Sequence, residues 1–240
     1  MDSIGDRLPE TSNVIDSGIK RGLHTGLQLY VSRGGNVVAD CGFGESSPSV
    51  PMTADSIMMW LSAGKPLTAV AILQLVEHGL LDLDGRIVDW IPEFATGNKE
   101  QVRLHHLLTH TGGFRNVETG WPHLSWEATI ARICESPLED GWLIGETAGY
   151  HTSSSWYILG ELIQRVDPKR QSFPEYFHKE ICEPLGMLNS QNGMSPEFWM
   201  TNQHRIAEMS QLEKGKTEVL PWHDKQYCMA ASPGANSRGP

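Results

Sequence analysis

Cysteine is scarce in this sequence, and the few cysteines stand far apart. The 240 residues include four of them: Cys41, Cys134, Cys182 and Cys228. No two have the close spacing of a cysteine zinc site or of a Cys-x-x-Cys redox pair. Sparse, scattered cysteines favour free thiols in a reducing compartment, although their number is also compatible with a disulfide. The cysteines therefore indicate no functional site.

Positive charge and long apolar runs are lacking as well. Lys and Arg number 19 against 29 Asp and Glu, a formal net charge of -10, whereas binding to nucleic-acid phosphates needs a basic face. No apolar run approaches the roughly 20 residues of a membrane-spanning helix. The start, MDSIGDRLPE, is polar and acidic, unlike a signal peptide. We therefore expect no nucleic-acid and no membrane partner. We expect a cytoplasmic location, or a periplasmic or secreted one if a leader has been removed.

What is present is the composition of an ordinary globular protein, with 39% hydrophobic and 20% charged residues. Residues 10–22 have the apolar spacing of an amphipathic helix. The stretch GLQLYVSRGGNVVADCGFG alternates apolar and polar residues around Gly34-Gly35, which predicts a β-hairpin. From Ser62 to Leu81, closely spaced apolar residues predict a helix that is buried on most sides and ends at His78-Gly79.

The rest of the chain gives a coarser prediction. Residues 82–205 are mainly helix-like segments separated by turns. Residues 206–240 have little periodicity and are predicted as a loop that returns toward the sheet. Together with residues 1–81, this order lacks the regular alternation of strands and helices that builds parallel sheets. We predict an α/β fold of the α+β kind, in which an antiparallel sheet flanked by helices carries a mostly helical subdomain.

A serine and a lysine three residues apart stand at the start of the predicted buried helix, in WLSAGKPLTAV. Residues i and i+3 of a helix share a face, so Ser62 and Lys65 can reach each other. Burial lowers the pKa of a lysine, and a neutral amine can accept a serine proton near pH 7. Pro66 fits the first helical turn, and a helix N-terminus favours negative charge developing at Ser62. The pair has the features of an activated nucleophile and its proton acceptor.

Spacing alone does not establish this role. Ser17 and Lys20 have the same spacing, but charged residues flank them on what we predict to be a solvated helix face. The alternative for Ser62 and Lys65 is a serine that caps the helix and a lysine whose stem packs along it.

Tyr150 is the candidate for a second proton-transfer group. It lies in a turn of GETAGYHTSSSWYILGELI, just before an apolar helix-like run that begins at Trp156. A nearby lysine ammonium favours the phenolate, and a tyrosine in that position can act as a base or an acid. The alternative is a core tyrosine whose hydroxyl has an ordinary hydrogen-bond partner.

Several segments are similar, in the same order, to the conserved boxes of one known family. SAGKPLTA is similar to a Ser-x-x-Lys box, LHHLLTHTGGF to an LLTHTSGL segment, and CEPLGM to a PLGM segment. From about residue 20 to its end, the chain thus resembles the penicillin-recognising serine hydrolases of the class C β-lactamase type. That family includes β-lactamases, D-alanyl-D-alanine peptidases and related esterases. The resemblance implies the same fold, catalytic roles for Ser62, Lys65 and Tyr150, and no metal or organic cofactor.

The sequence departs from the family pattern in two places. Thr152 stands where β-lactamases usually have an asparagine that contacts the substrate amide. The resemblance therefore implies that Thr152 binds substrate, and it favours esters over β-lactams. A late strand with a Lys-Thr-Gly or His-x-Gly box is not found, because Lys216-Thr217 is followed by Glu218 in a polar stretch predicted as loop. By the resemblance, roughly the last third of a usual member is absent.

These observations predict a serine hydrolase that forms an acyl-enzyme with a small-molecule ester, amide or β-lactam, and above all with an ester. The alternatives are a β-lactamase or D-alanyl-D-alanine carboxypeptidase, and a truncated, non-catalytic module that binds acyl compounds. His106 and His110 have the i, i+4 spacing of zinc ligands, with His105 beside them, but no carboxylate or cysteine is suitably near. We predict no metal site, and the sequence leaves the oligomeric state open.

Overall fold

The computed structural model describes residues 4–213, 216–233 and 237–239, which fall into two compact units. The hairpin unit comprises Met1–Met58 and Met200–Asp224, and the helical unit comprises Met59–Trp199 and Lys225–Gly239. These divisions differ from the predicted segments 1–81, 82–205 and 206–240. The Ser62 helix belongs to the same unit as the helices that follow it, because it packs against them.

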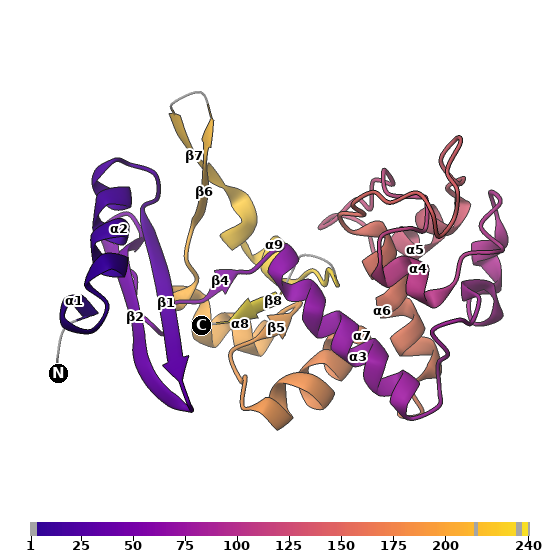
Figure 1. The fold of residues 1–240 in the computed structure, drawn as a ribbon, viewed down its shortest axis with the longest axis horizontal. Coiled ribbons are helices and arrows are strands. Elements are labelled where there is room, and N and C mark those ends of the chain that lie inside the picture. Colours follow the sequence, from indigo (N-terminus) through magenta and orange to yellow (C-terminus); the bar gives the residue numbers. More distant parts are fainter. Residues whose placement is uncertain (1–3, 214–215, 234–236, 240) are drawn as a thin grey trace. The chain divides into compact units, whose positions relative to one another are not determined.

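The hairpin unit contains the predicted amphipathic helix and the predicted β-hairpin, which lie side by side (Figure 1). The turn of the hairpin is Gly34-Gly35, with φ angles of 57° and 78°. A two-residue hairpin turn favours glycine because both residues adopt positive φ. The elements of this first stretch are α1 (Ile4–Arg7), α2 (Pro9–Lys20), β1 (Gly26–Arg33), β2 (Asn36–Ser47) and β3 (Val50–Pro51).

A second hairpin joins this unit from the other end of the chain. Strands β6 (Met209–Glu213) and β7 (Lys216–Leu220) pair antiparallel, so the loop predicted over 206–240 is wrong for these residues. The sequence MSQLEKGKTEVL has few apolar residues, and a mostly polar hairpin gives no alternating pattern to read. Lys216-Thr217 therefore lies in a strand. Main-chain hydrogen bonds attach the base of this hairpin: Glu208 N–H donates to the Ser46 carbonyl over 2.8 Å.

The helical unit is built mainly of helices, with a small three-stranded sheet. The π-helical segment Phe177–Cys182 continues directly from α7. Strand β4 (Met58–Met59) and helix α8 (Pro196–Asn202) lie where the chain passes between units. The unit's other helices and strands are α3 (Lys65–Glu77), α4 (Leu104–Leu108), α5 (Trp126–Glu135), α6 (Ser154–Val166), α7 (Phe173–Tyr176), α9 (Lys225–Met229), β5 (Gln191–Asn192) and β8 (Ser237–Gly239).

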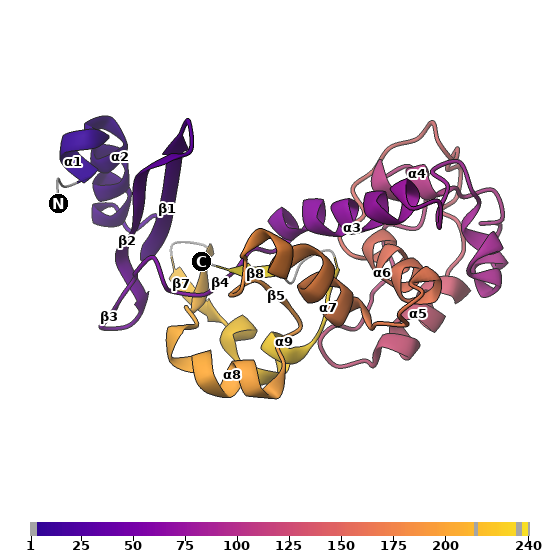
Figure 2. The same ribbon diagram turned by 90° about the horizontal axis from the view of Figure 1, so that it is seen from below.

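Helix α6 lies at the centre of the helical unit's core, and α3 packs against it (Figure 2). Ala71, Ile72 and Leu75 of α3 face this core. The prediction that α3 is buried on most sides is wrong, because Val70 is 43% exposed and Leu73 is 47% exposed. The predicted end of the helix is confirmed: α3 stops at Glu77, and Gly79 follows with a φ of 71°.

The segment after α9 returns along the core and braces the helices that position the site. Thr68 of α3 donates to the Pro233 carbonyl over 2.7 Å, and Tyr157 of α6 donates to the Ala231 carbonyl over 3.0 Å. The amide of Asn192 donates to the Ser232 carbonyl and its oxygen accepts from the Ser232 N–H. The loop prediction holds for 230–233, and α9 and β8 are further departures from it.

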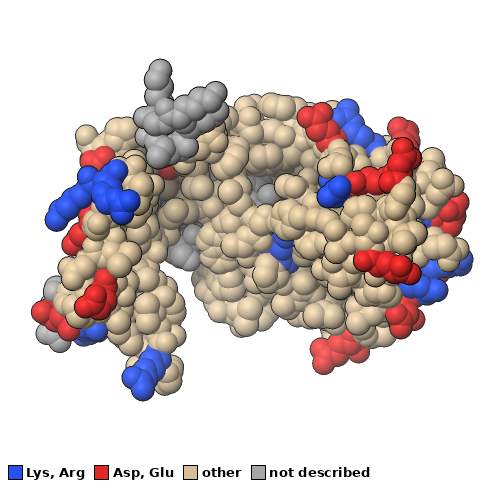
Figure 3. Space-filling model, turned by 45° about the horizontal axis from the view of Figure 1, so that its top comes forward, with Lys and Arg blue, Asp and Glu red and all other residues tan. Residues whose placement is uncertain are grey.

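On the face shown in Figure 3, Lys and Arg side chains stand scattered among Asp and Glu. Of the helices that the structure describes, none has both the length and the apolar character that a bilayer crossing requires. All four cysteines, which lie within the described ranges, are free thiols, as predicted.

Candidate active site

Ser62 begins a short 3-10 turn, Ser62–Gly64, that leads directly into α3. The residue before it, Leu61, has φ 49° and ψ -134°, a conformation that side-chain-bearing residues rarely adopt. The turn's hydrogen bonds run from the N–H of Ala63 to Trp60 and from that of Gly64 to Leu61. The N–H of Ser62 precedes them, in the position of a helix-terminal donor.

Lys65 is the first residue of α3 and contacts Ser62 across the turn. Residues i and i+3 eclipse each other in a 3-10 turn, which brings the Lys65 Nζ to 2.9 Å from the Ser62 Oγ. The same nitrogen donates to the carbonyl of Thr152 over 2.8 Å. Lys65 is only 6% exposed, and its desolvation lowers the pKa of the amine, although the Tyr150 hydroxyl partly opposes this. The predicted contact and the predicted direction of the pKa are therefore present.

Tyr150 completes the group around Ser62. The Lys65 Nζ stands 5.1 Å from the centre of the Tyr150 ring, and the side chains of Ser62 and Lys65 interact with its hydroxyl. Desolvation raises the pKa of Tyr150, but the interactions of its hydroxyl with Ser62 and Lys65 and the lysine charge lower it below its ordinary value. The residue is 53% exposed, so the alternative of an enclosed core tyrosine is excluded.

Thr152 contributes its backbone rather than its side chain to these contacts. Its carbonyl accepts the hydrogen bond from Lys65, while the residue as a whole is exposed. The predicted substrate-binding role of its side chain stays a prediction.

Burial alone does not give a lysine the environment of Lys65. Lys99 is fully buried, and desolvation lowers its pKa as well. Its amine donates to the backbone carbonyls of Thr96, Cys134 and Ser136, with no hydroxyl nucleophile among these partners. The other Ser-x-x-Lys pair differs in the opposite way, because Ser17 and Lys20 are both exposed on α2.

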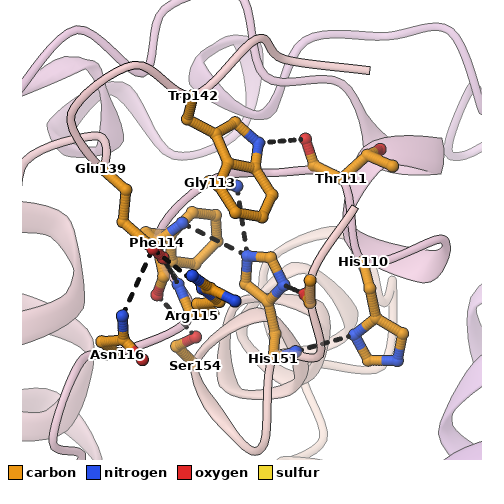
Figure 4. A network of polar contacts seen from close by, with 11 residues as sticks. His110, Thr111, Gly113, Phe114, Arg115, Asn116, Glu139, Trp142, His151 and Ser154 are labelled. Atoms are coloured by element: carbon orange, nitrogen blue, oxygen red, sulfur yellow. Dashed lines mark hydrogen bonds and ion pairs between the residues drawn. The ribbon is translucent and has the colours of Figure 1, made fainter. Parts of the chain in front are cut away.

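A histidine network beside Tyr150 was not predicted from the sequence (Figure 4). His151 is fully buried, and its Nε2 accepts hydrogen bonds from the N–H groups of Gly113 and Phe114. The backbone N–H of His151 donates to the Nδ1 of His110 over 3.1 Å. The ring of His110 lies 4.8 Å from the ring of Tyr150. The available signal was that His151 directly follows Tyr150, but a lone histidine does not reveal its partners 37 and 38 residues away.

Each of the three histidines considered above as a zinc ligand contacts a different partner. His105 stands 3.2 Å from a carboxylate oxygen of Asp84, and His106 accepts a hydrogen bond from the backbone N–H of Arg103. His110 accepts from His151. In the described part of the chain, no three His, Cys, Asp or Glu side chains gather as metal ligands would.

Comparison with known proteins agrees with this fold. The Beta-lactamase family model matches residues 12–236. Esterase EstB of Burkholderia gladioli is 35% identical over 196 residues, which cover 72% of this chain and 48% of that protein. Penicillin-binding protein 4* of Bacillus subtilis (strain 168) is 23% identical over 181 residues, or 70% of this chain and 39% of that protein. The chain therefore belongs to the Beta-lactamase family, which confirms the resemblance seen in the sequence.

The crystal structure of a family VIII carboxylesterase superposes with a TM-score of 0.79. The match covers 97% of this chain and 66% of that structure, at 23% identity, so it bears on the fold alone. It confirms the predicted mixed fold of helices and antiparallel strands. The chain spans about half the length, or less, of the curated relatives it matches.

Proposed function

We propose that this chain carries the catalytic site of a serine hydrolase that cleaves small-molecule esters through an acyl-enzyme. The observation that carries the proposal is the 2.9 Å contact between the Lys65 Nζ and the Ser62 Oγ. That contact lies at the start of a helix and joins a partly exposed hydroxyl to a desolvated amine. A neutral amine in that place can take the proton of the hydroxyl as the oxygen attacks.

The reaction follows from these contacts. The Ser62 Oγ attacks the carbonyl carbon of the ester while its proton passes to the neutral amine of Lys65. Tyr150, whose hydroxyl interacts with both side chains, donates its proton to the departing alkoxide and regains one from Lys65. Water then attacks the acyl-Ser62 ester with the same groups acting in reverse. We assign the Ser62 N–H as one donor to the oxyanion, a contribution of about 2.7–4 kcal/mol for such a donor.

The presence of threonine rather than asparagine at position 152 supports an ester as substrate over a β-lactam. Threonine has no side-chain amide to donate to and accept from a substrate amide at once, as asparagine can. The similarity to Esterase EstB supports the same preference. A β-lactamase or D-alanyl-D-alanine carboxypeptidase is the second candidate, supported by the similarity to Penicillin-binding protein 4*.

Turnover of p-nitrophenyl acetate and p-nitrophenyl butyrate, measured beside nitrocefin, tests the proposal. We expect slow ester hydrolysis that Ser62→Ala abolishes and Ser17→Ala leaves unchanged, since Ser17 is the exposed serine of the same spacing. Nitrocefin hydrolysis at a comparable rate would favour the second candidate. Tight binding of these esters without turnover would instead identify a non-catalytic binding module.

A further inference from the structure

We propose that His151 is a positioning residue of the Ser62 site, a role that rests on the proposed function. Its imidazole ring accepts hydrogen bonds from the turn 110–114 (Figure 4). The ring thereby fastens the segment 149–152 to that turn and fixes where Tyr150 and the Thr152 carbonyl stand relative to Lys65.

The hydrogen bonds of the His151 ring use both of its nitrogens. The Nε2 accepts from the N–H of Gly113 over 3.1 Å and from that of Phe114 over 3.2 Å. The Nδ1 stands 2.7 Å from the carbonyl oxygen of Gly149. Two donors on Nε2 and an acceptor on Nδ1 require one neutral tautomer, with its proton on Nδ1. The ring is thereby fixed in orientation.

These bonds hold Tyr150 from both sides along the chain. On one side, the N–H of Gly149 donates to the His110 carbonyl over 3.1 Å, and the Gly149 carbonyl accepts from the His151 ring. On the other side, the N–H of His151 donates to the Nδ1 of His110. His110 has a φ of 60°, which such contacts can maintain. The backbone on each side of Tyr150 is therefore tied to the turn 110–114.

The surroundings of the ring keep it neutral. Phe114 and Trp142 pack edge-on against it, with ring centres 5.2 and 5.9 Å away. The charged and titratable groups that face it are His110, Arg115 and Glu139. Desolvation, the largest effect, lowers the pKa of His151 to about 4. A proton on Nε2 would face the N–H groups of Gly113 and Phe114 and break both hydrogen bonds.

Two substitutions separate the effect of the Nε2 acceptor from the effect of the space that the His151 ring fills. His151→Phe retains an aromatic ring but leaves the two N–H groups without their acceptor. His151→Gln provides an amide oxygen near the position of Nε2 and cannot be protonated in this range. His106→Phe is the matched control, because His106 is also buried and also accepts from a backbone N–H, but in α4 rather than beside Tyr150.

Two readouts test the positioning role: kcat for p-nitrophenyl butyrate, and the titration of Tyr150 by NMR of ζ-¹³C-labelled tyrosine. The Tyr150 signal is assigned with Tyr150→Phe. In His151→Phe we expect kcat to fall about 100-fold, as for a misplacement of about 1 Å, and the Tyr150 pKa to rise toward its ordinary value. His151→Gln should recover most of both, and His106→Phe should lower Tm while changing neither.

A folded His151→Phe with unchanged kcat and Tyr150 titration would overturn the proposal. If His151→Phe does not fold, His151→Ala, which also removes the acceptor, decides: a folded Ala variant with unchanged kcat and unchanged Tyr150 titration would overturn it. Failure of the proposed function would be seen separately, as wild-type protein without ester turnover. The Tyr150 titration would still report on His151 in that case.

Discussion

At the scale of single residues, the site depends on what surrounds the Lys65 amine. The sequence allowed this to be predicted for Ser62 and Lys65, because their spacing at the start of an apolar helix is a local property. It did not allow the partners of His151 to be predicted, since Gly113 and Phe114 reach its ring only through the tertiary fold. Contacts within one turn can be read from spacing, whereas a contact between two loops cannot.

Activity should rise with pH, because the reaction needs Lys65 without its proton. Desolvation lowers the pKa of Lys65 from 10.5, and the net effect on Tyr150 is a pKa below 10.0. We therefore expect kcat/KM for p-nitrophenyl butyrate to increase through a pKa below 10.5, the ordinary value for lysine, and to lose that dependence in Lys65→Ala. General-base catalysis contributes about 10²–10⁴-fold, so Lys65→Ala should lower kcat/KM by that factor. Lys20→Ala, on the exposed helix face, is the control, and an equal loss there would contradict the assignment.

The stability of the fold should depend on the protonation of His151. Its pKa is about 4 when folded and 6.5 ordinarily, so the unfolded chain binds the proton more readily. The contribution of His151 is then complete above pH 6.5 and decreases as the pH falls toward 4. The loss amounts to about 3 kcal/mol in the free energy of unfolding at pH 4 relative to pH 7. Urea unfolding of wild type and His151→Gln at both pH values measures it, and an identical pH dependence in the two would count against a neutral buried ring.

At the scale of elements, the strongest patterns gave correct predictions and the weak ones did not. The Gly34-Gly35 hairpin and the end of α3 near Gly79 follow from local backbone requirements. The strands β6 and β7 were missed because their mostly polar sequence, MSQLEKGKTEVL, has no alternating apolar pattern. Helix α3 was expected to be more buried than it is. The apolar composition of a helix does not determine how much of its surface packs against other elements.

Helix α6 offers a test of how tightly the core is packed. Gly160→Ala in a helix would ordinarily stabilise it by about 1 kcal/mol. Here an added Cβ would stand 2.7 Å from the Trp126 ring and 2.8 Å from Pro233. The Trp126 ring cannot easily move, because its Nε1 donates to Glu161 over 2.7 Å. We expect a net loss of about 1–2 kcal/mol from overpacking, measured as a lower Tm by calorimetry. A higher Tm would show that the helix is less confined than these distances indicate.

At the scale of the whole molecule, family membership rests on the order of several short segments rather than on any one of them. The Ser-x-x-Lys spacing occurs twice in this chain. Only in the pair Ser62 and Lys65 does a desolvated lysine amine contact the serine hydroxyl and interact with Tyr150. The sequence predicted the fold class through that resemblance. It did not predict that two separate stretches of chain would build each compact unit, because pairing between distant stretches leaves no local pattern.

Covalent labelling of Ser62 by a fluorophosphonate tests the central assignment most directly. Its rate, followed by intact-protein mass spectrometry with peptide mapping between pH 6 and 10, needs no knowledge of the natural substrate. We expect one adduct, on Ser62, forming faster as the pH rises, about 10²–10⁴-fold slower in Lys65→Ala and unaffected in Lys20→Ala. Labelling of Ser62 at the same rate with and without Lys65 would show that this buried amine does not activate the serine.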